Sequence, residues 1–107
     1  MTHLDPQPPP TAGHGDVWLD VVEAMPGVGL MPRGPLMVDM MQRRAQGLAR
    51  YGTPLQYDNG RDHWVDAYQE YLDGVAYLWA ARAPWWLRWG AVLFAALVRR
   101  RLTSEAR

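Results

Sequence analysis

Apolar residues recur at helical spacing in four segments of the chain, and stretches rich in proline and glycine separate these segments. The first segment, residues 16–25 (DVWLDVVEAM), predicts a short helix capped by Asp16. Residues 26–35 (PGVGLMPRGP) predict a break, because proline and glycine interrupt helices. A second helix is predicted from about residue 36 to residue 50, where methionines at helical spacing form an adaptable packing surface.

The third segment has the most regular pattern. The loop before it, residues 51–60, ends in Asn59-Gly60, and Asp58 or Asn59 is expected to cap a helix from about residue 61 to residue 82. One face of this helix is apolar, with steps of four, three and four residues: Tyr68, Leu72, Val75 and Trp79. Another face is almost entirely acidic and carries Asp62, Asp66, Glu70 and Asp73.

The last segment is the most apolar. Proline suits a first helical turn, so WWLRWGAVLFAALV predicts a helix from Pro84 to about Leu102. The uncharged run after Arg88 is ten residues long, which is shorter than the ~20 apolar residues that span a bilayer. Two interpretations stay open: a buried bundle or dimer helix, which is favoured, and an interfacial helix with tryptophan anchors and an Arg-rich end.

These patterns predict an all-α fold, a small helical bundle of three to four helices, because no segment alternates apolar and polar residues as a strand does. We expect one helical domain over residues 16–107, after a disordered lead over residues 1–15 that has too little apolar area to offset ordering. The last two helices carry more apolar surface than a chain of 107 residues can bury alone. Completion of the bundle by oligomerisation is therefore expected.

Composition excludes several functional classes. The 11 basic residues, all arginine, balance 11 acidic ones, so the charge expected of a dedicated nucleic-acid binder is missing. No cysteine is present, which excludes thiolate chemistry and fits the cytoplasmic location that the absence of a signal-peptide pattern also suggests. The sequence has neither a phosphate-binding Gly-Lys-Ser/Thr loop nor a serine placed for a catalytic triad.

The acidic row is the first candidate for chemistry. Like charges four residues apart on a helix repel by roughly 0.2–0.5 kcal/mol per pair. The helix dipole offsets this cost near the N-terminus but not at Glu70 and Asp73, which are mid-helix. Their Glu-x-x-Asp spacing directs two carboxylates to one side, which suits Mg²⁺ bound together with substrate phosphates. The alternative is a solvated face, or salt bridges to arginines.

The run YGTPLQYDNGRDHWVDAYQEYLDGVAYL resembles small phage-encoded proteins of the MazG-like, all-α nucleoside triphosphate pyrophosphohydrolase group, over about residues 36–82. The resemblance implies a Glu-x-x-Glu helix and a Glu-x-x-Asp helix whose four carboxylates hold Mg²⁺ against the triphosphate. Glu70 and Asp73 match the second motif. The first motif is missing, and the position closest to it is Asp39-x-x-Gln42, which is expected to weaken the site. Asp66, one turn from Glu70, is expected to supply a substitute ligand.

The resemblance also gives the loop a candidate role. Tyr51 and Tyr57 are expected to stack on a base, and Asn59 and Arg61 to meet phosphate oxygens at a helix N-terminus. Arg43 adds a cationic group beside the altered motif. The alternative is structural: Asn59-Gly60 turns the chain, and Arg61 pairs with Asp58 or Asp62.

The expected function is therefore that of a phage-type MazG-like nucleotide-binding protein, which holds a nucleotide or a nucleotide-derived signal and sequesters it from a host defence. One alternative is an active Mg²⁺-dependent pyrophosphohydrolase. The other is an interaction protein that docks through its Trp-rich C-terminal helix. The expected partners are a nucleotide and further copies of the chain, without nucleic acid, and membrane contact is the less favoured interpretation.

Overall fold

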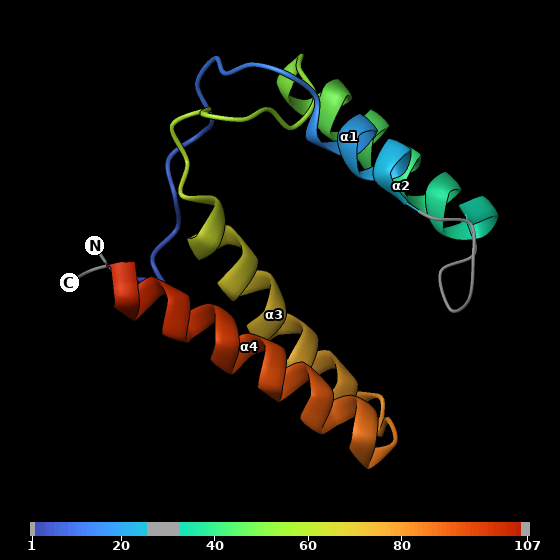
Figure 1. Cartoon of the computed structure of the whole chain (residues 1–107), viewed down its shortest axis with the longest axis vertical. Helices are drawn as coiled ribbons and strands as arrows, with labels where there is room; N and C mark the ends of the chain where they lie inside the picture. The colour runs from blue at the N-terminus through green and yellow to red at the C-terminus, as the bar shows by residue number, and fades with distance from the viewer. Residues whose placement is uncertain (1, 26–32, 106–107) are drawn as a thin grey trace. The chain divides into compact units, whose positions relative to one another are not determined.

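The structure is a computed structural model that describes residues 2–25 and 33–105. Its four helices are α1 (Val17–Ala24), α2 (Arg33–Tyr51), α3 (His63–Ala80) and α4 (Trp85–Glu105), shown in Figure 1. The described residues form no strand, and their one β-bridge joins His14 to Tyr57. The all-α prediction is confirmed. Most of the predicted break lies outside the described residues, and α2 begins about three residues earlier than its pattern predicted.

The helix caps agree with the sequence at α1 and differ at α3. Asp16 caps α1, because its Oδ1 accepts the amide of Leu19 at 3.1 Å. The prediction that Asp58 or Asn59 caps α3 is wrong. Asp62 is the cap, and its Oδ1 accepts the amides of Trp64 at 3.0 Å and Val65 at 3.2 Å. A cap must directly precede the first turn for its oxygen to reach these amides.

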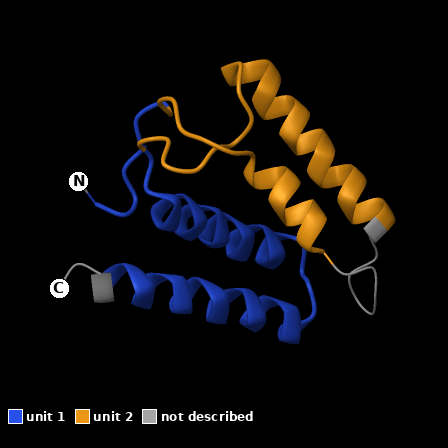
Figure 2. Ribbon diagram, turned by 45° about the horizontal axis from the view of Figure 1, so that its top comes forward, with its two compact units in different colours: residues 1–9, 61–107 blue, residues 10–60 orange. Residues whose placement is uncertain are grey.

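The chain divides into two compact units, which Figure 2 distinguishes by colour. Unit 1 comprises residues 1–9 and 61–107, and unit 2 comprises residues 10–60. The lead is thus shared between both units, and its described residues make defined contacts in each. Disorder of the lead and a single domain over residues 16–107 stay predictions.

Unit 1 is a hairpin of α3 and α4, which lie side by side (Figure 1). The buried residues of α4 are Ala95 and Leu102. Aromatic side chains cover much of the contact: Tyr71 stacks on Phe94 at 6.1 Å, and the rings of Trp79 and Trp89 meet edge to face at 5.5 Å. Two arginines of α4 add cation–π contacts to α3, with Arg88 lying 4.9 Å from the ring centre of Trp79 and Arg101 5.4 Å from that of Trp64.

Unit 2 packs α1 against α2, with Val22 and Met25 buried. The guanidinium of Arg44 donates from Nε to Asp16 Oδ2 at 2.8 Å, and this ion pair links the N-terminal end of α1 to α2. Burial acts to raise the pKa of Asp16, but its hydrogen bonds to Arg44 and to the amide of Leu19 outweigh burial and lower the pKa below the ordinary value.

The loop after α2 pairs with the chain before α1. The amide of Thr11 donates to Asn59 O at 2.7 Å, and His14 and Tyr57 exchange two backbone hydrogen bonds of 3.0 and 2.9 Å. The approach is so close that a Cβ at Gly13 would overlap the carbonyl oxygen of Tyr57. Glycine is therefore required here by lack of space.

Candidate functional site

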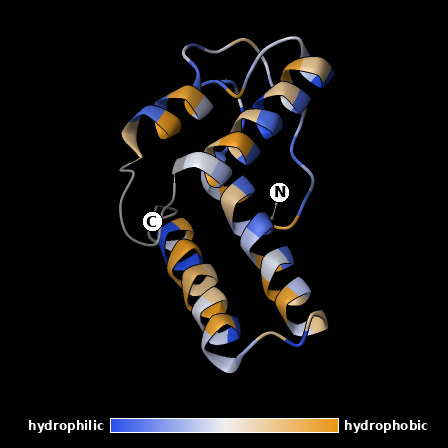
Figure 3. Cartoon of the chain, turned by 90° about the vertical axis from the view of Figure 1, so that its right-hand side faces the viewer, coloured by the Kyte–Doolittle hydropathy of each residue, from blue (hydrophilic) through white to orange (hydrophobic). Residues whose placement is uncertain are grey.

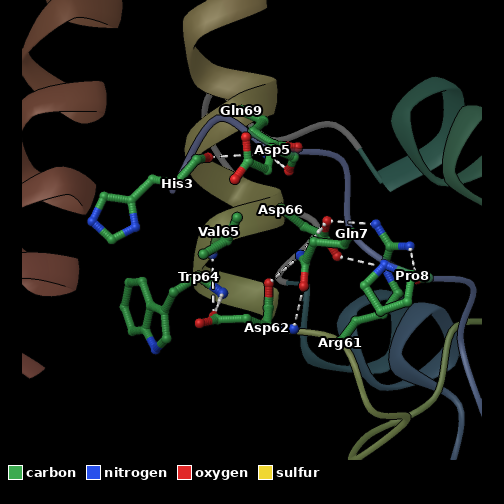
Figure 4. A network of polar contacts seen from close by, with 10 residues as sticks. All are labelled: His3, Asp5, Gln7, Pro8, Arg61, Asp62, Trp64, Val65, Asp66 and Gln69. Atoms are coloured by element: carbon green, nitrogen blue, oxygen red, sulfur yellow. Dashed lines mark hydrogen bonds and ion pairs between the residues drawn. The ribbon is translucent and has the colours of Figure 1, made fainter. Parts of the chain in front are cut away.

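The first candidate site lies where α3 begins, and Figure 4 shows its polar contacts. Arg61 donates to both carboxylate oxygens of Asp66, from Nε at 3.0 Å and from Nη2 at 2.7 Å, in a two-pronged ion pair. Its Nη1 donates to the carbonyl oxygen of Pro8 at 2.7 Å. The guanidinium fork of Arg61, which was predicted to bind a phosphate, thus binds a carboxylate, and its partner is Asp66 rather than Asp58 or Asp62.

The N-terminal lead completes this network. Gln7 donates from Nε2 to Asp66 Oδ1 and to Asp62 O, both at 2.7 Å, and its Oε1 accepts the amide of Asp62 at 2.8 Å. Further along α3, Nε2 of Gln69 donates to the carbonyl oxygens of His3 and Asp5, each at 2.9 Å. The N-terminal lead therefore lies along the acidic face of α3 over the first two turns of the helix (Figure 4).

Asp66 is held in its charged form. Its partial burial acts to raise the pKa, but hydrogen bonds from Arg61 and Gln7, with the charge of Arg61, outweigh burial and lower the pKa below the ordinary value of 3.8. Its oxygens are occupied by three donors. Asp66 would have to give up these bonds to serve as the substitute metal ligand.

Glu70 and Asp73 lie beyond this network on α3. Both side chains are exposed, and neither forms an ion pair with another residue of the described chain. Asp39, the remaining predicted metal ligand, is exposed on α2 in unit 2. Within residues 2–25 and 33–105, no group of three or more acidic or histidine side chains is placed to hold a metal ion. Of the four carboxylates predicted to hold Mg²⁺, only Glu70 and Asp73 are therefore exposed together on one helix of the described chain.

The predicted ligand residues of unit 2 have structural contacts. The hydroxyl of Tyr57 donates to Asp20 Oδ2 at 2.6 Å, and this bond raises the pKa of Tyr57 above its ordinary value of 10.0. Asn59 is buried, and its carbonyl oxygen accepts both the amide and the hydroxyl of Thr11, at 2.7 and 2.9 Å.

Two other candidates lie on α2. Tyr51 ends the helix half-exposed, under the guanidinium of Arg50 at 5.2 Å, and Arg43 donates to Gln46 Oε1 at 3.0 Å. The loop's observed contacts thus hold the lead and α1, whereas its predicted role in nucleotide binding stays a prediction.

The second candidate site is an apolar surface on α4. Figure 3 shows hydrophobic colour on successive turns of this helix. The buried residues Ala95 and Leu102 are seven positions apart and lie on one side. On the opposite side, four side chains are each more than half exposed, and we call them the α4 outer face: Trp86, Trp89, Leu93 and Leu97. The sequence pattern marked α4 as apolar but did not distinguish the side that α3 covers.

Comparison of the chain with protein-family models, with curated proteins and with solved structures finds no match. Its function must therefore be inferred from its own residues. One physical limit applies to α4: no helix of the described chain is long and apolar enough to cross a membrane.

Proposed function

We propose that this chain is an interaction protein that binds its partner through the α4 outer face. The observation that carries the proposal is the distribution of exposure around α4. A helix that is apolar all round belongs in the interior of a protein or an assembly. Yet Trp86 is 61% exposed, Trp89 58%, Leu93 58% and Leu97 51%.

The size of this surface supports the proposal. A buried aromatic side chain contributes roughly 150–250 Å², so Trp86 and Trp89, which are each more than half exposed, offer roughly 250 Å². Each partner in a standard interface contributes about 800 Å², and Leu93 and Leu97 extend the patch further along α4. Tryptophan is also the residue type most enriched among those that dominate binding energies.

The experiment compares Leu97→Glu with Ala76→Glu. Both positions are exposed, but Ala76 lies on α3 away from the α4 outer face. Each protein is tested for self-association by sedimentation velocity and for flotation with vesicles of phosphatidylcholine and phosphatidylglycerol. It is also tested for cross-linking in cells through a photoreactive phenylalanine at residue 89. We expect Leu97→Glu to abolish at least one interaction that Ala76→Glu leaves intact. Identical behaviour of the two variants and the wild-type protein in all three assays would refute the proposal.

As a second candidate, we propose that α3 takes part in holding a nucleotide or a nucleotide-derived signal, as in the MazG-like group and in the sequestering role expected of a phage protein. The supporting observation is that Glu70 and Asp73 are exposed and form no ion pair within the described chain. Two carboxylates on one side of a helix are a usual part of a Mg²⁺–phosphate site. Mg²⁺ would supply neutralisation of phosphate charge there. Among the described residues, this pair alone does not make up the four carboxylates expected of the hydrolase.

This second proposal is tested with a nucleotide panel in Mg²⁺ or Mn²⁺, followed by filtration and chromatography of both fractions. Retention of an intact nucleotide that is lost in Glu70→Gln but not in Glu23→Gln supports it, because Glu23 is also an exposed carboxylate but lies on α1. Conversion of a triphosphate to monophosphate and pyrophosphate would instead establish the hydrolase. No retention and no turnover for any nucleotide would remove the candidate.

A further inference from the structure

The exposed side of α4 has a symmetric residue pattern. Its central stripe advances by three, four, four and three residues: Trp86, Trp89, Leu93, Leu97 and Arg100. These steps keep side chains on one face of a helix, and all five residues are exposed. Read from either end, the stripe has the same spacing about Leu93. In a two-fold symmetric contact residue i meets residue j and j meets i, and this spacing sets every residue of the stripe opposite another residue of the stripe.

We propose that the occupant of the α4 outer face is a second copy of this chain, with α4 packed antiparallel on α4 and Leu93 on the two-fold axis. The inference rests on the proposed function and names its partner. In this register Trp89 lies level with Leu97 of the second copy, and Trp86 lies level with its Arg100. Each apolar residue of the stripe then meets an apolar residue or a cation suited to it.

The ends of the stripe are chemically complementary. A guanidinium is attracted to the face of a tryptophan ring, and more strongly so where water is excluded. The chain already joins α4 to α3 in this manner twice, with Arg88 over Trp79 at 4.9 Å and Arg101 over Trp64 at 5.4 Å. The proposed dimer repeats the pairing between Trp86 and Arg100, once at each end of the contact.

The middle of the stripe allows close approach. Gly90 and Ala96 flank Leu93 at equal distances along the sequence, and the antiparallel register sets each opposite the other. A Cβ built at Gly90 has no atom within 4 Å, so nothing in the chain itself requires a glycine there. In helix pairs that pack tightly, small residues let the backbones come together. Trp86 and Trp89 of the two copies together supply roughly 500 Å² of the ~1,600 Å² that a standard interface buries.

Self-association is measured first by sedimentation velocity on the full chain. Leu93→Glu buries two carboxylates at the axis, and we expect a rise of ~100-fold or more in the dimer dissociation constant. Arg100→Glu removes both cation–π contacts and should raise it ~10-fold. Arg99→Glu is the matched control, because it makes the same charge change one position off the stripe and should leave the constant within about 2-fold. Circular dichroism checks that each variant retains its helices.

The register is tested with single cysteines, since the chain has none of its own. Leu93→Cys places two thiols together on the axis, and oxidation should yield a covalent dimer. Leu97→Cys is a similarly exposed control. In the antiparallel register its two thiols are eight residues apart along the helices, or roughly 12 Å, which exceeds the Cα separation of roughly 4.4–6.8 Å that a disulfide spans. We expect no rapid cross-link from Leu97→Cys.

The results of these experiments distinguish failure of the proposed dimer from failure of the proposed interaction function. Equal cross-linking of both cysteine variants would indicate parallel helices and overturn the register. A monomer at high micromolar concentration, or a dimer that Leu93→Glu leaves intact, would overturn the second copy as the occupant. In those cases the interaction function stands if Leu97→Glu still abolishes vesicle flotation or a cellular cross-link, and it falls as well if Leu97→Glu changes nothing.

Discussion

The ion pair between Arg61 and Asp66 is expected to stabilise unit 1 measurably. The perturbation is Asp66→Asn, which keeps the shape of the side chain but removes its charge. Asp66 accepts two N–H groups from Arg61, at 3.0 and 2.7 Å, and one from Gln7 at 2.7 Å. Hydrogen bonds to charged groups contribute about 1.5–3 kcal/mol when buried. Because the side chains of Arg61 and Asp66 are 24% and 29% exposed, screening reduces this contribution, and we expect a loss of ~1–2 kcal/mol.

The assay is urea unfolding followed by tryptophan fluorescence, which reports mainly on unit 1 because Trp18 is the only tryptophan of unit 2. Asp73→Asn is the matched control, since Asp73 is exposed on the same helix without an ion pair in the described chain, and we expect it to change stability by less than about 0.5 kcal/mol. Equal losses in the two variants would refute the assignment.

The pH dependence of this difference has a defined sign. The pKa of Asp66 is lowered in the folded chain, so the folded state favours the carboxylate. The stabilisation is complete above the ordinary pKa of 3.8 and is lost as the pH falls through the folded-state value. The gap between wild-type and Asp66→Asn should therefore be full at pH 7 and should shrink as the pH falls below 3.8. A gap that stays constant over this range would show that packing, not charge, is responsible.

Three further predictions concern stability. Gly13→Ala should destabilise unit 2 by more than ~1 kcal/mol, because the added Cβ would overlap Tyr57 O. Gly47→Ala, in open space within α2, should instead stabilise the protein by up to ~1 kcal/mol. Thermal unfolding followed by circular dichroism distinguishes the two. Asp62→Ala should cost ~1 kcal/mol of stability through loss of the α3 cap, and a smaller effect than that of Asp58→Ala in urea unfolding would contradict the assignment of the cap. Deletion of residues 2–9 should raise amide exchange at the start of α3, and unchanged exchange would instead favour the predicted disordered lead.

Sequence alone was sufficient for the helices of this protein. The apolar spacing in each segment and the proline and glycine between segments act over a few residues, and helix formation depends on those same local terms. Asp16 was identified as a cap for this reason. The cap of α3 was misassigned because the loop offers several aspartates, and only the backbone path decides which of them directly precedes the first turn.

Tertiary structure decided which candidate site residues have partners within the chain and which are exposed to solvent. Arg61 has the planar guanidinium that suits a phosphate, but folding brings the carboxylate of Asp66 and the carbonyl oxygen of Pro8, which is distant in sequence, to its N–H groups. Gly13 gave no signal in the sequence, since its constraint is the carbonyl of Tyr57, 44 residues away. Contacts distant in sequence also decide the exposure of the α4 outer face. Periodicity shows that α4 is apolar, but exposure depends on which side α3 covers, and packing between segments distant in sequence determines that side.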